Sequence, residues 1–306
     1  MNANTPAGRP TDPVNSSSPL TCADGSLPTT TVEPLPARPS ADRTQALRDR
    51  LSDRDVAVLR SLATLRLLTG GQARRLHVAD GSAATQSRRA RALLQRLADL
   101  KLVVRLGRRV GGVRAGSAGY VYGLSGHGQA VLAVEGPMGG RRRRVWETSP
   151  SFQDHVLGVA EVYVRLVEAE RTGSLEMLDF QAEPPAWRTF PGANGPAVLK
   201  PDAFVRLGVD DLEHSAFLEI DRSTESVPTI VRKCRTYVAY WQSGIEQAEH
   251  EVFPRVLWLA ADARGAQRIT QALTQMPRDA QHLFQVTFLE SAVPVLTATA
   301  RGGRMV

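Results

Sequence analysis

Residues 199–241, LKPDAFVRLGVDDLEHSAFLEIDRSTESVPTIVRKCRTYVAYW, decide the fold of the C-terminal half of this chain. Apolar and polar residues alternate up to Val209, and they alternate again from His214 to Asp221 after a turn at 210–211. Such alternation predicts two strands joined as a hairpin. A polar loop and an amphipathic helix follow, and that helix carries Lys233 and Tyr237 one turn apart.

The hairpin carries an unusual group of acids. Glu219 and Asp221 share one face of the second strand, and Asp202 stands at the start of its partner strand. Carboxylates this close repel one another, and a divalent cation relieves the repulsion. Oxygen ligands on adjacent strands are the pattern of Mg²⁺ phosphodiesterase sites. The plain alternative is a pair of exposed acids at a strand end.

Charge divides the chain into a basic and an acidic half. Residues 42–144 hold 21 Lys and Arg against 7 Asp and Glu, a net charge of +14. Residues 151–306 hold 15 against 20, a net charge of −5. The basic half is therefore expected to grip a polyanion, for which double-stranded DNA is the expected partner.

Composition excludes several other classes of protein. No apolar run approaches the roughly 20 residues that span a bilayer, and the start of the chain has no signal-peptide pattern. Cys22 and Cys234 offer neither a disulfide framework nor zinc-ligand spacing. A cytoplasmic protein without membrane partners is expected.

The sequence of the basic half predicts three helices followed by a hairpin. Ser52, Thr69 and Ser82 are expected helix caps, and the third helix buries a stripe through Ala90 and Leu94. Two strand-like runs, 103–110 and 120–124, flank a tip rich in glycine and arginine. This order resembles the winged helix-turn-helix, whose third helix enters the major groove. The resemblance makes these arginines the DNA-binding candidates: Arg88, Arg89, Arg91, Arg96, Arg108, Arg109 and Arg114.

These patterns divide the chain into five expected segments. They are a disordered tail over 1–41, a winged helix-turn-helix domain over 42–136, a basic linker over 137–150 with four arginines at 141–144, an α/β domain over 151–292, and a C-terminal tail over 293–306.

A long helix is expected to open the second domain. It spans about 153–170, with Glu161 set among apolar residues. His155 near its start is interpreted as a packing or capping residue, and Tyr237 on the later helix as a core residue. Residues 184–196 are expected to form a loop.

Pro201-Asp202 and Glu219-Ile220-Asp221 resemble the core of the PD-(D/E)xK nuclease-like fold, an α/β domain with a mixed sheet. The resemblance implies catalytic roles for Asp202, Glu219, Asp221 and Lys233, and Mg²⁺ as a cofactor held by Asp202, Glu219 and Glu161. The chain departs from the pattern at 221, where aspartate stands in place of the expected lysine. Lys233 or Lys200 would have to replace it.

The basic winged helix, Lys200-Pro201-Asp202, Glu219-Ile220-Asp221-Arg222 and Lys233 with Tyr237 together resemble the replication-relaxation family of plasmids and integrated mobile elements. The resemblance implies a DNA-binding protein in replication, relaxation or transfer, with plasmid replication or transfer proteins, or a second copy, as further partners. A Mg²⁺-dependent endonuclease or nickase is one alternative, and a winged-helix transcriptional regulator is another.

Overall fold

A computed structural model describes residues 41–106, 120–134, 136, 149–193, 195–223 and 225–302. The expected tail lies outside these residues except for Ala41, which begins a helix. The tip of the N-terminal hairpin also lies outside them, together with Arg108, Arg109 and Arg114. So do residues 137–148 of the expected linker, which include the four arginines.

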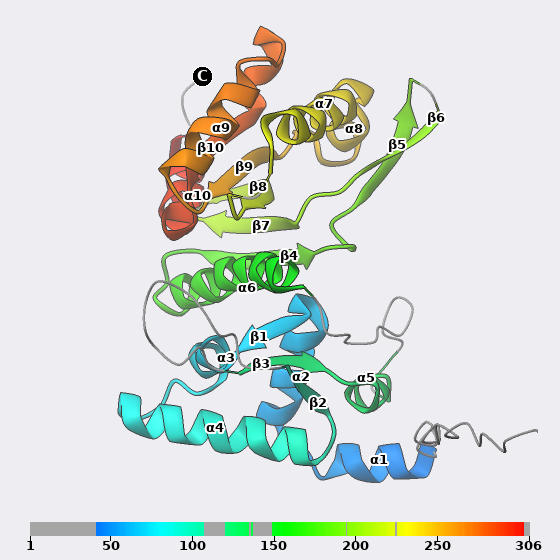
Figure 1. Ribbon diagram of the computed structural model, residues 1–306, viewed down its shortest axis with the longest axis vertical. Helices are drawn as coiled ribbons and strands as arrows, with labels where there is room; N and C mark the ends of the chain where they lie inside the picture. The colour runs from blue at the N-terminus through cyan, green and yellow to red at the C-terminus, as the bar shows by residue number, and fades with distance from the viewer. Residues whose placement is uncertain are drawn as a thin grey trace, which may run out of the picture. The chain divides into compact units, whose positions relative to one another are not determined.

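The described part of the N-terminal half contains helices and three short strands (Figure 1). In chain order they are α1 (Ala41–Asp49), α2 (Asp53–Leu65), β1 (Leu67–Thr69), α3 (Gly70–His77), α4 (Ala83–Asp99), β2 (Val103–Leu106), β3 (Val121–Leu124) and α5 (Gly126–Leu132). β3 lies between β1 and β2 and pairs antiparallel with both.

Side-chain caps fix where these helices begin. The Ser52 hydroxyl accepts a hydrogen bond from the backbone of Asp55, and the Asp55 carboxylate accepts one in return from the backbone of Ser52. Thr69 and Gln72 form the same reciprocal pair at α3. These caps satisfy backbone donors that a helix start leaves without partners. The element order is the one expected of a winged helix, and that assignment stays a prediction.

The C-terminal half alternates helices and strands around one larger sheet. Its elements are α6 (Pro150–Arg171), β4 (Glu176–Ala182), β5 (Arg188–Gly192), β6 (Gly195–Leu199), β7 (Ala203–Val209), β8 (Leu212–Asp221), α7 (Val227–Ser243), α8 (Ile245–His250), β9 (Arg255–Ala260), α9 (Ala263–Leu273), a 3-10 turn (Arg278–Leu283), β10 (Phe284–Phe288), a second 3-10 turn (Leu289–Ser291) and α10 (Ala292–Gly302).

The five-stranded sheet has the order β10-β9-β8-β7-β4. β9 pairs parallel with β8 and β10, whereas β7 pairs antiparallel with β8 and β4, so the sheet is mixed. One face packs its apolar side chains with α7 and α9, and the other packs with α6 and α10. This mixed α/β architecture confirms the expected fold class. No helix among the described residues is both long and apolar enough to cross a bilayer.

Helix α6 contributes to two hydrophobic cores. Val159, Val162 and Leu166 pack with the sheet of the C-terminal half. Ala160 and Val164 are buried with the apolar side chains of α2, α3 and α4. This 22-residue helix connects the two halves, because it contributes buried side chains to both cores.

Two segments differ from the sequence-based expectation. Part of the expected loop at 184–196 is β-structure, since β5 and β6 pair as a hairpin and bury Phe190 and Leu199. The expected C-terminal tail begins as helix α10, because Ala292 and Leu296 pack into the core beside α6. Both elements owe their structure to contacts with distant residues, which local patterns do not reveal.

Candidate functional site

The register of β7 and β8 brings Asp202 and Glu219 close together. Ala203 faces Leu218 across the antiparallel pair, and the backbone N–H of Asp202 donates to the carbonyl of Leu218 over 3.2 Å. The carboxylate of Asp202 accepts a hydrogen bond from the backbone N–H of Ile220 over 2.7 Å. Asp202 and Glu219 are both buried, so their charges act on each other in a region of low polarity.

Glu219 is held by two donors from α7. Lys233 Nζ lies 2.9 Å from one carboxylate oxygen, and the Tyr237 hydroxyl donates to the other over 2.7 Å. Burial and the negative charge of Asp202 raise the pKa of Glu219 to about 7, against the opposing effect of Lys233 and Tyr237. Glu219 therefore changes charge near neutral pH.

Lys233 is the cation of this cluster. Besides Glu219 it pairs with Glu225 over 3.0 Å, and its ammonium lies 5.6 Å from the ring centroid of Trp258. Burial lowers the pKa of Lys233, but the charges of Glu219, Asp202 and Glu225 outweigh that effect and raise it. Lys233 is therefore a fixed positive charge and does not serve as a proton acceptor near neutral pH.

His155 reaches Asp202 from α6. Its Nε2 lies 3.2 Å from a carboxylate oxygen of Asp202. Burial lowers the pKa of His155, but the hydrogen bond to Asp202 and the charge of Asp202 raise it overall. The sequence predicted a packing or capping role for His155 and did not predict this contact. The sequence carries little sign of the contact between His155 and Asp202, because only the crossing of α6 over the start of β7 brings the two residues together.

Asp221 is buried two residues further along β8 and has partners of its own. Its carboxylate accepts a hydrogen bond from the backbone N–H of Ser223 over 3.0 Å and lies 3.5 Å from Arg268. A Cβ placed on Gly265, at the start of α9, would lie 2.7 Å from the Asp221 carboxylate, so the start of that helix packs directly on it. The positive end of the helix and Arg268 offset the charge of this aspartate.

Glu161 is engaged with the N-terminal half. Arg75 donates to both of its carboxylate oxygens, over 2.7 and 2.9 Å, and Gln72 and Arg165 add further hydrogen bonds. None of the contacts found for Glu161 among the described residues is to Asp202 or Glu219. The structure therefore brings together Asp202, Glu219 and Lys233, and it gives Glu161 a different set of partners.

The acids do not offer an open site for a divalent cation in this arrangement. The oxygens of Asp202 accept from Ile220 and lie beside His155, while those of Glu219 accept from Lys233 and Tyr237. Within the described residues, no group of three His, Cys, Asp or Glu side chains is arranged to hold a metal ion. Mg²⁺ would have to displace Lys233 or His155, so the residues as placed do not fit the ion.

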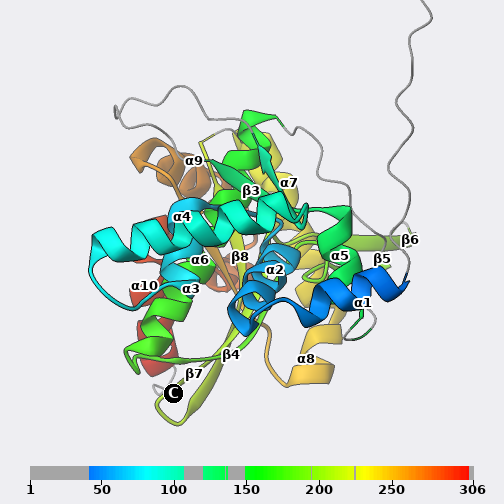
Figure 2. The ribbon, with the colours of Figure 1, turned by 90° about the horizontal axis from the view of Figure 1, so that it is seen from below.

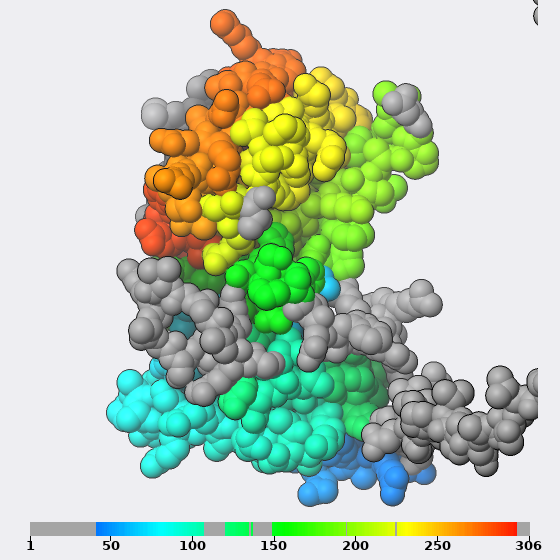
Figure 3. All heavy atoms as spheres, viewed as in Figure 1, coloured from blue at the N-terminus to red at the C-terminus, as the bar shows by residue number. Residues whose placement is uncertain are grey.

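The expected DNA-binding arginines are divided between open and paired positions. Arg88, Arg89 and Arg91 are exposed on α4, which runs along the outer side of the N-terminal half in Figure 2 and is at the surface in Figure 3. Arg96 also lies on α4 but pairs with the buried carboxylate of Asp55. That contact makes Arg96 part of the scaffold of α2 and α4.

Comparisons with known proteins show the family of this chain and include a distant structural likeness. The model of the replication-relaxation family matches residues 59–256. The structure of restriction endonuclease FokI is similar over 86% of this chain and 76% of its own, with 10% identity and a TM-score of 0.22. That likeness is too distant to define the fold or the function. No curated protein matches the sequence significantly.

Proposed function

Because this chain belongs to the replication-relaxation family, we propose that it is a DNA-binding protein acting in the replication, relaxation or transfer of a plasmid or integrated mobile element. The observation that supports DNA binding is the exposed arginine face of α4, Arg88, Arg89 and Arg91, on a helix whose other side is buried. Arginines on a fixed helix suit phosphate contacts and the edges of guanine bases.

The test is binding of duplex DNA by the full chain with Arg88, Arg89 and Arg91 replaced by alanine. We expect most of the affinity to be lost, and the salt slope to fall by about one for each arginine that contacts phosphate. The matched control replaces Arg232, Arg235 and Arg264, three exposed arginines of the acidic half, and removes the same charge. Equal loss in the control would mean that net charge carries the binding, and unchanged affinity in the α4 variant would refute the proposal.

The meeting of Asp202, Glu219 and Lys233 favours a second candidate, a Mg²⁺-dependent endonuclease or nickase. We prefer DNA binding without cleavage, because protein donors already surround both carboxylates, which leaves no free oxygens to hold a metal ion. Nicking of supercoiled plasmid with Mg²⁺ or Mn²⁺ tests this preference. We expect wild type and Glu219→Ala to show the same background. Nicking by wild type that disappears in both Glu219→Ala and Lys233→Ala would make the protein an enzyme.

A further inference from the structure

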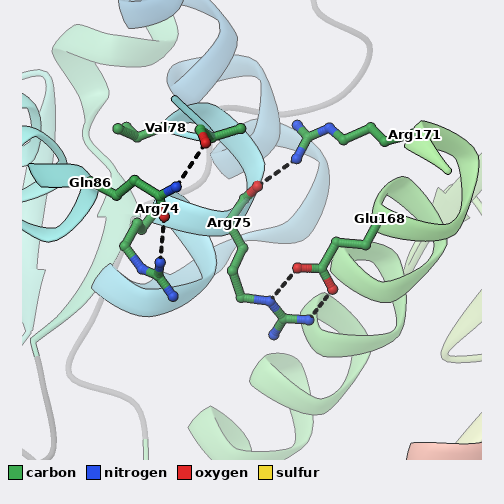
Figure 4. Close-up of a pocket in the computed structure, with 7 residues that line it drawn as sticks. Arg74, Arg75, Val78, Gln86, Glu168 and Arg171 are labelled. Atoms are coloured by element: carbon green, nitrogen blue, oxygen red, sulfur yellow. Dashed lines mark hydrogen bonds and ion pairs between the residues drawn. The ribbon is translucent and has the colours of Figure 1, made fainter. Parts of the chain in front are cut away.

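A pocket of about 340 Å³ lies between the C-terminal end of α3, the start of α4 and the C-terminal end of α6 (Figure 4). Its polar lining consists of Arg74, Arg75, Gln86, Glu168 and Arg171. The wall thus carries three guanidinium groups and one carboxylate, and that carboxylate is paired with Arg75. None of these residues contacts Asp202, Glu219 or Lys233 in the described part of the chain, so the pocket is separate from the acidic cluster.

Only one of the three arginines is neutralised. Arg75 donates to Glu168 through two nitrogens and to Glu161 through the third. Arg74 and Arg171 form no ion pair among the described residues, and their hydrogen-bond partners are uncharged. The pKa of the neighbouring His77 is lowered to about 4, by burial and then by the charges of Arg171 and Arg54, as expected in a positive environment.

Both of these arginines are held in place. Gln86 accepts a hydrogen bond from Arg74 over 2.8 Å, and its amide nitrogen donates to the carbonyls of Ala79 and Gly81 in the turn before α4. Arg171 donates to the carbonyls of Arg75 and Leu76, at the end of α3. Both side chains line the pocket, and Figure 4 shows Arg74 on the side of Gln86 and Arg171 on the side of Glu168. Fixed donors lose little conformational freedom when a ligand binds.

We propose that this pocket binds a phosphate group through Arg74 and Arg171. Guanidinium groups match phosphate oxygens in geometry, and their charge makes the hydrogen bonds strong. The phosphate has two sources, the backbone of a duplex lying along α4 or a free phosphate ester. The first source rests on the proposed DNA binding, since Gln86 joins the pocket to the helix that carries Arg88 and Arg89.

The experiment compares full-length wild type with Arg74→Gln and Arg171→Gln, and uses Arg235→Gln as a matched control at an exposed position on α7. Glutamine keeps the aliphatic part of the side chain and removes the charge. The first measurement is binding of inorganic phosphate, from the rise of the unfolding midpoint at constant ionic strength. We expect the apparent affinity to fall about tenfold in either pocket variant and to be unchanged in the control.

The second measurement is the salt dependence of duplex binding over about 50 to 200 mM salt. A slope reduced by about one in Arg74→Gln, but not in Arg235→Gln, identifies the DNA backbone as the source. Phosphate binding that depends on both arginines while the DNA slope stays unchanged identifies a free phosphate ester. If wild type binds no DNA, the proposed function is wrong. The phosphate measurement still shows whether the pocket binds phosphate. Equal phosphate response in wild type, both pocket variants and the control would overturn the inference.

Discussion

At the scale of single residues, side chains of the protein itself neutralise the acidic cluster. Glu219 is 1% exposed, and its two oxygens are occupied by Lys233 and Tyr237. Removing Lys233 would leave a buried carboxylate without its cation, which is far more costly than losing an exposed ion pair. The lysine on α7 thus takes the place that a metal ion would have in a site built from acids alone.

At a pH above the pKa of Glu219, where its carboxylate is charged, Lys233→Ala is expected to lower the free energy of unfolding by about 3 kcal/mol, because it strands that charge in the protein interior. Urea unfolding of the full chain measures the change. Lys200→Ala is the control, since Lys200 is exposed and lies over the ring of Trp187. Adding Glu219→Gln to the Lys233 variant should recover part of the loss. A double variant no more stable than the single one would contradict this explanation.

Glu219 also predicts a dependence of stability on pH. Its pKa is about 7 in the folded protein against an ordinary value of 4.5, so the folded state retains a proton that the unfolded chain releases. The stability contributed by this proton is fully present below about 4.5 and is lost as the pH rises through about 7. In Glu219→Gln, the fall in unfolding free energy between these pH values should be smaller than in wild type. The exposed Glu249→Gln should behave as wild type, and an unchanged fall in Glu219→Gln would be evidence against the raised pKa.

At the scale of elements, the close approach of α6 to β8 positions His155. Gly158, one turn after His155, would bring a Cβ within 2.9 Å of the Cγ2 methyl of Ile220. A larger residue at position 158 must push the helix away from the strand. That movement would also break the contact between His155 and Asp202.

Gly158→Val is therefore expected to cost about 1–3 kcal/mol of stability, as overpacked core positions do. The same change should lower the pKa of His155 toward its ordinary value, because the imidazole loses the carboxylate of Asp202. Urea unfolding and NMR titration of the histidine ring measure the two effects. Gly126→Ala is the control, since a Cβ at that helix start meets no atom within 4 Å. A Gly158 variant that is stable and has an unchanged His155 pKa would show that the helix can shift freely.

The elements also show how far the sequence can predict this molecule. Ser52, Thr69 and Ser82 mark helix starts by local chemistry, and the alternation over 203–209 marks a strand, so these elements were predictable. Asp202 and Glu219 could be paired because a two-residue turn fixes the hairpin register. The contact of His155 with Asp202 and that of Glu161 with Arg75 depend on helix packing, which no local pattern encodes.

At the scale of the whole molecule, the helix α6 that both cores share predicts that the two halves unfold together. A core substitution in the N-terminal half should therefore also lower the stability of the C-terminal half against unfolding. Leu94→Ala on α4 removes a side chain that is 1% exposed and should cost about 2–5 kcal/mol. The described tryptophans, Trp187, Trp241 and Trp258, all lie in the C-terminal half and report on that half through their fluorescence.

We expect Leu94→Ala to move the urea midpoint of tryptophan fluorescence by as much as the midpoint of circular dichroism, because one cooperative transition includes both halves. Leu273→Ala, a partly buried position on α9, provides the reciprocal substitution in the C-terminal half. A fluorescence midpoint that stays at the wild-type value in the Leu94 variant, with a second step in the dichroism, would show that the halves unfold independently.

The double-sided packing of α6 constrains how such proteins can exchange parts. A recombination event with its crossover before α6 joins the N-terminal half of one protein to α6 and the C-terminal half of another, so one of the two cores on this helix combines side chains from different proteins. Ala160 and Val164 would pack against the foreign N-terminal half, while Val159 and Val162 would keep their original contacts with the sheet of the C-terminal half. A viable chimera must therefore inherit the N-terminal half together with the side of α6 that it was selected to fit, and a crossover in the segment before Pro150 does not achieve this.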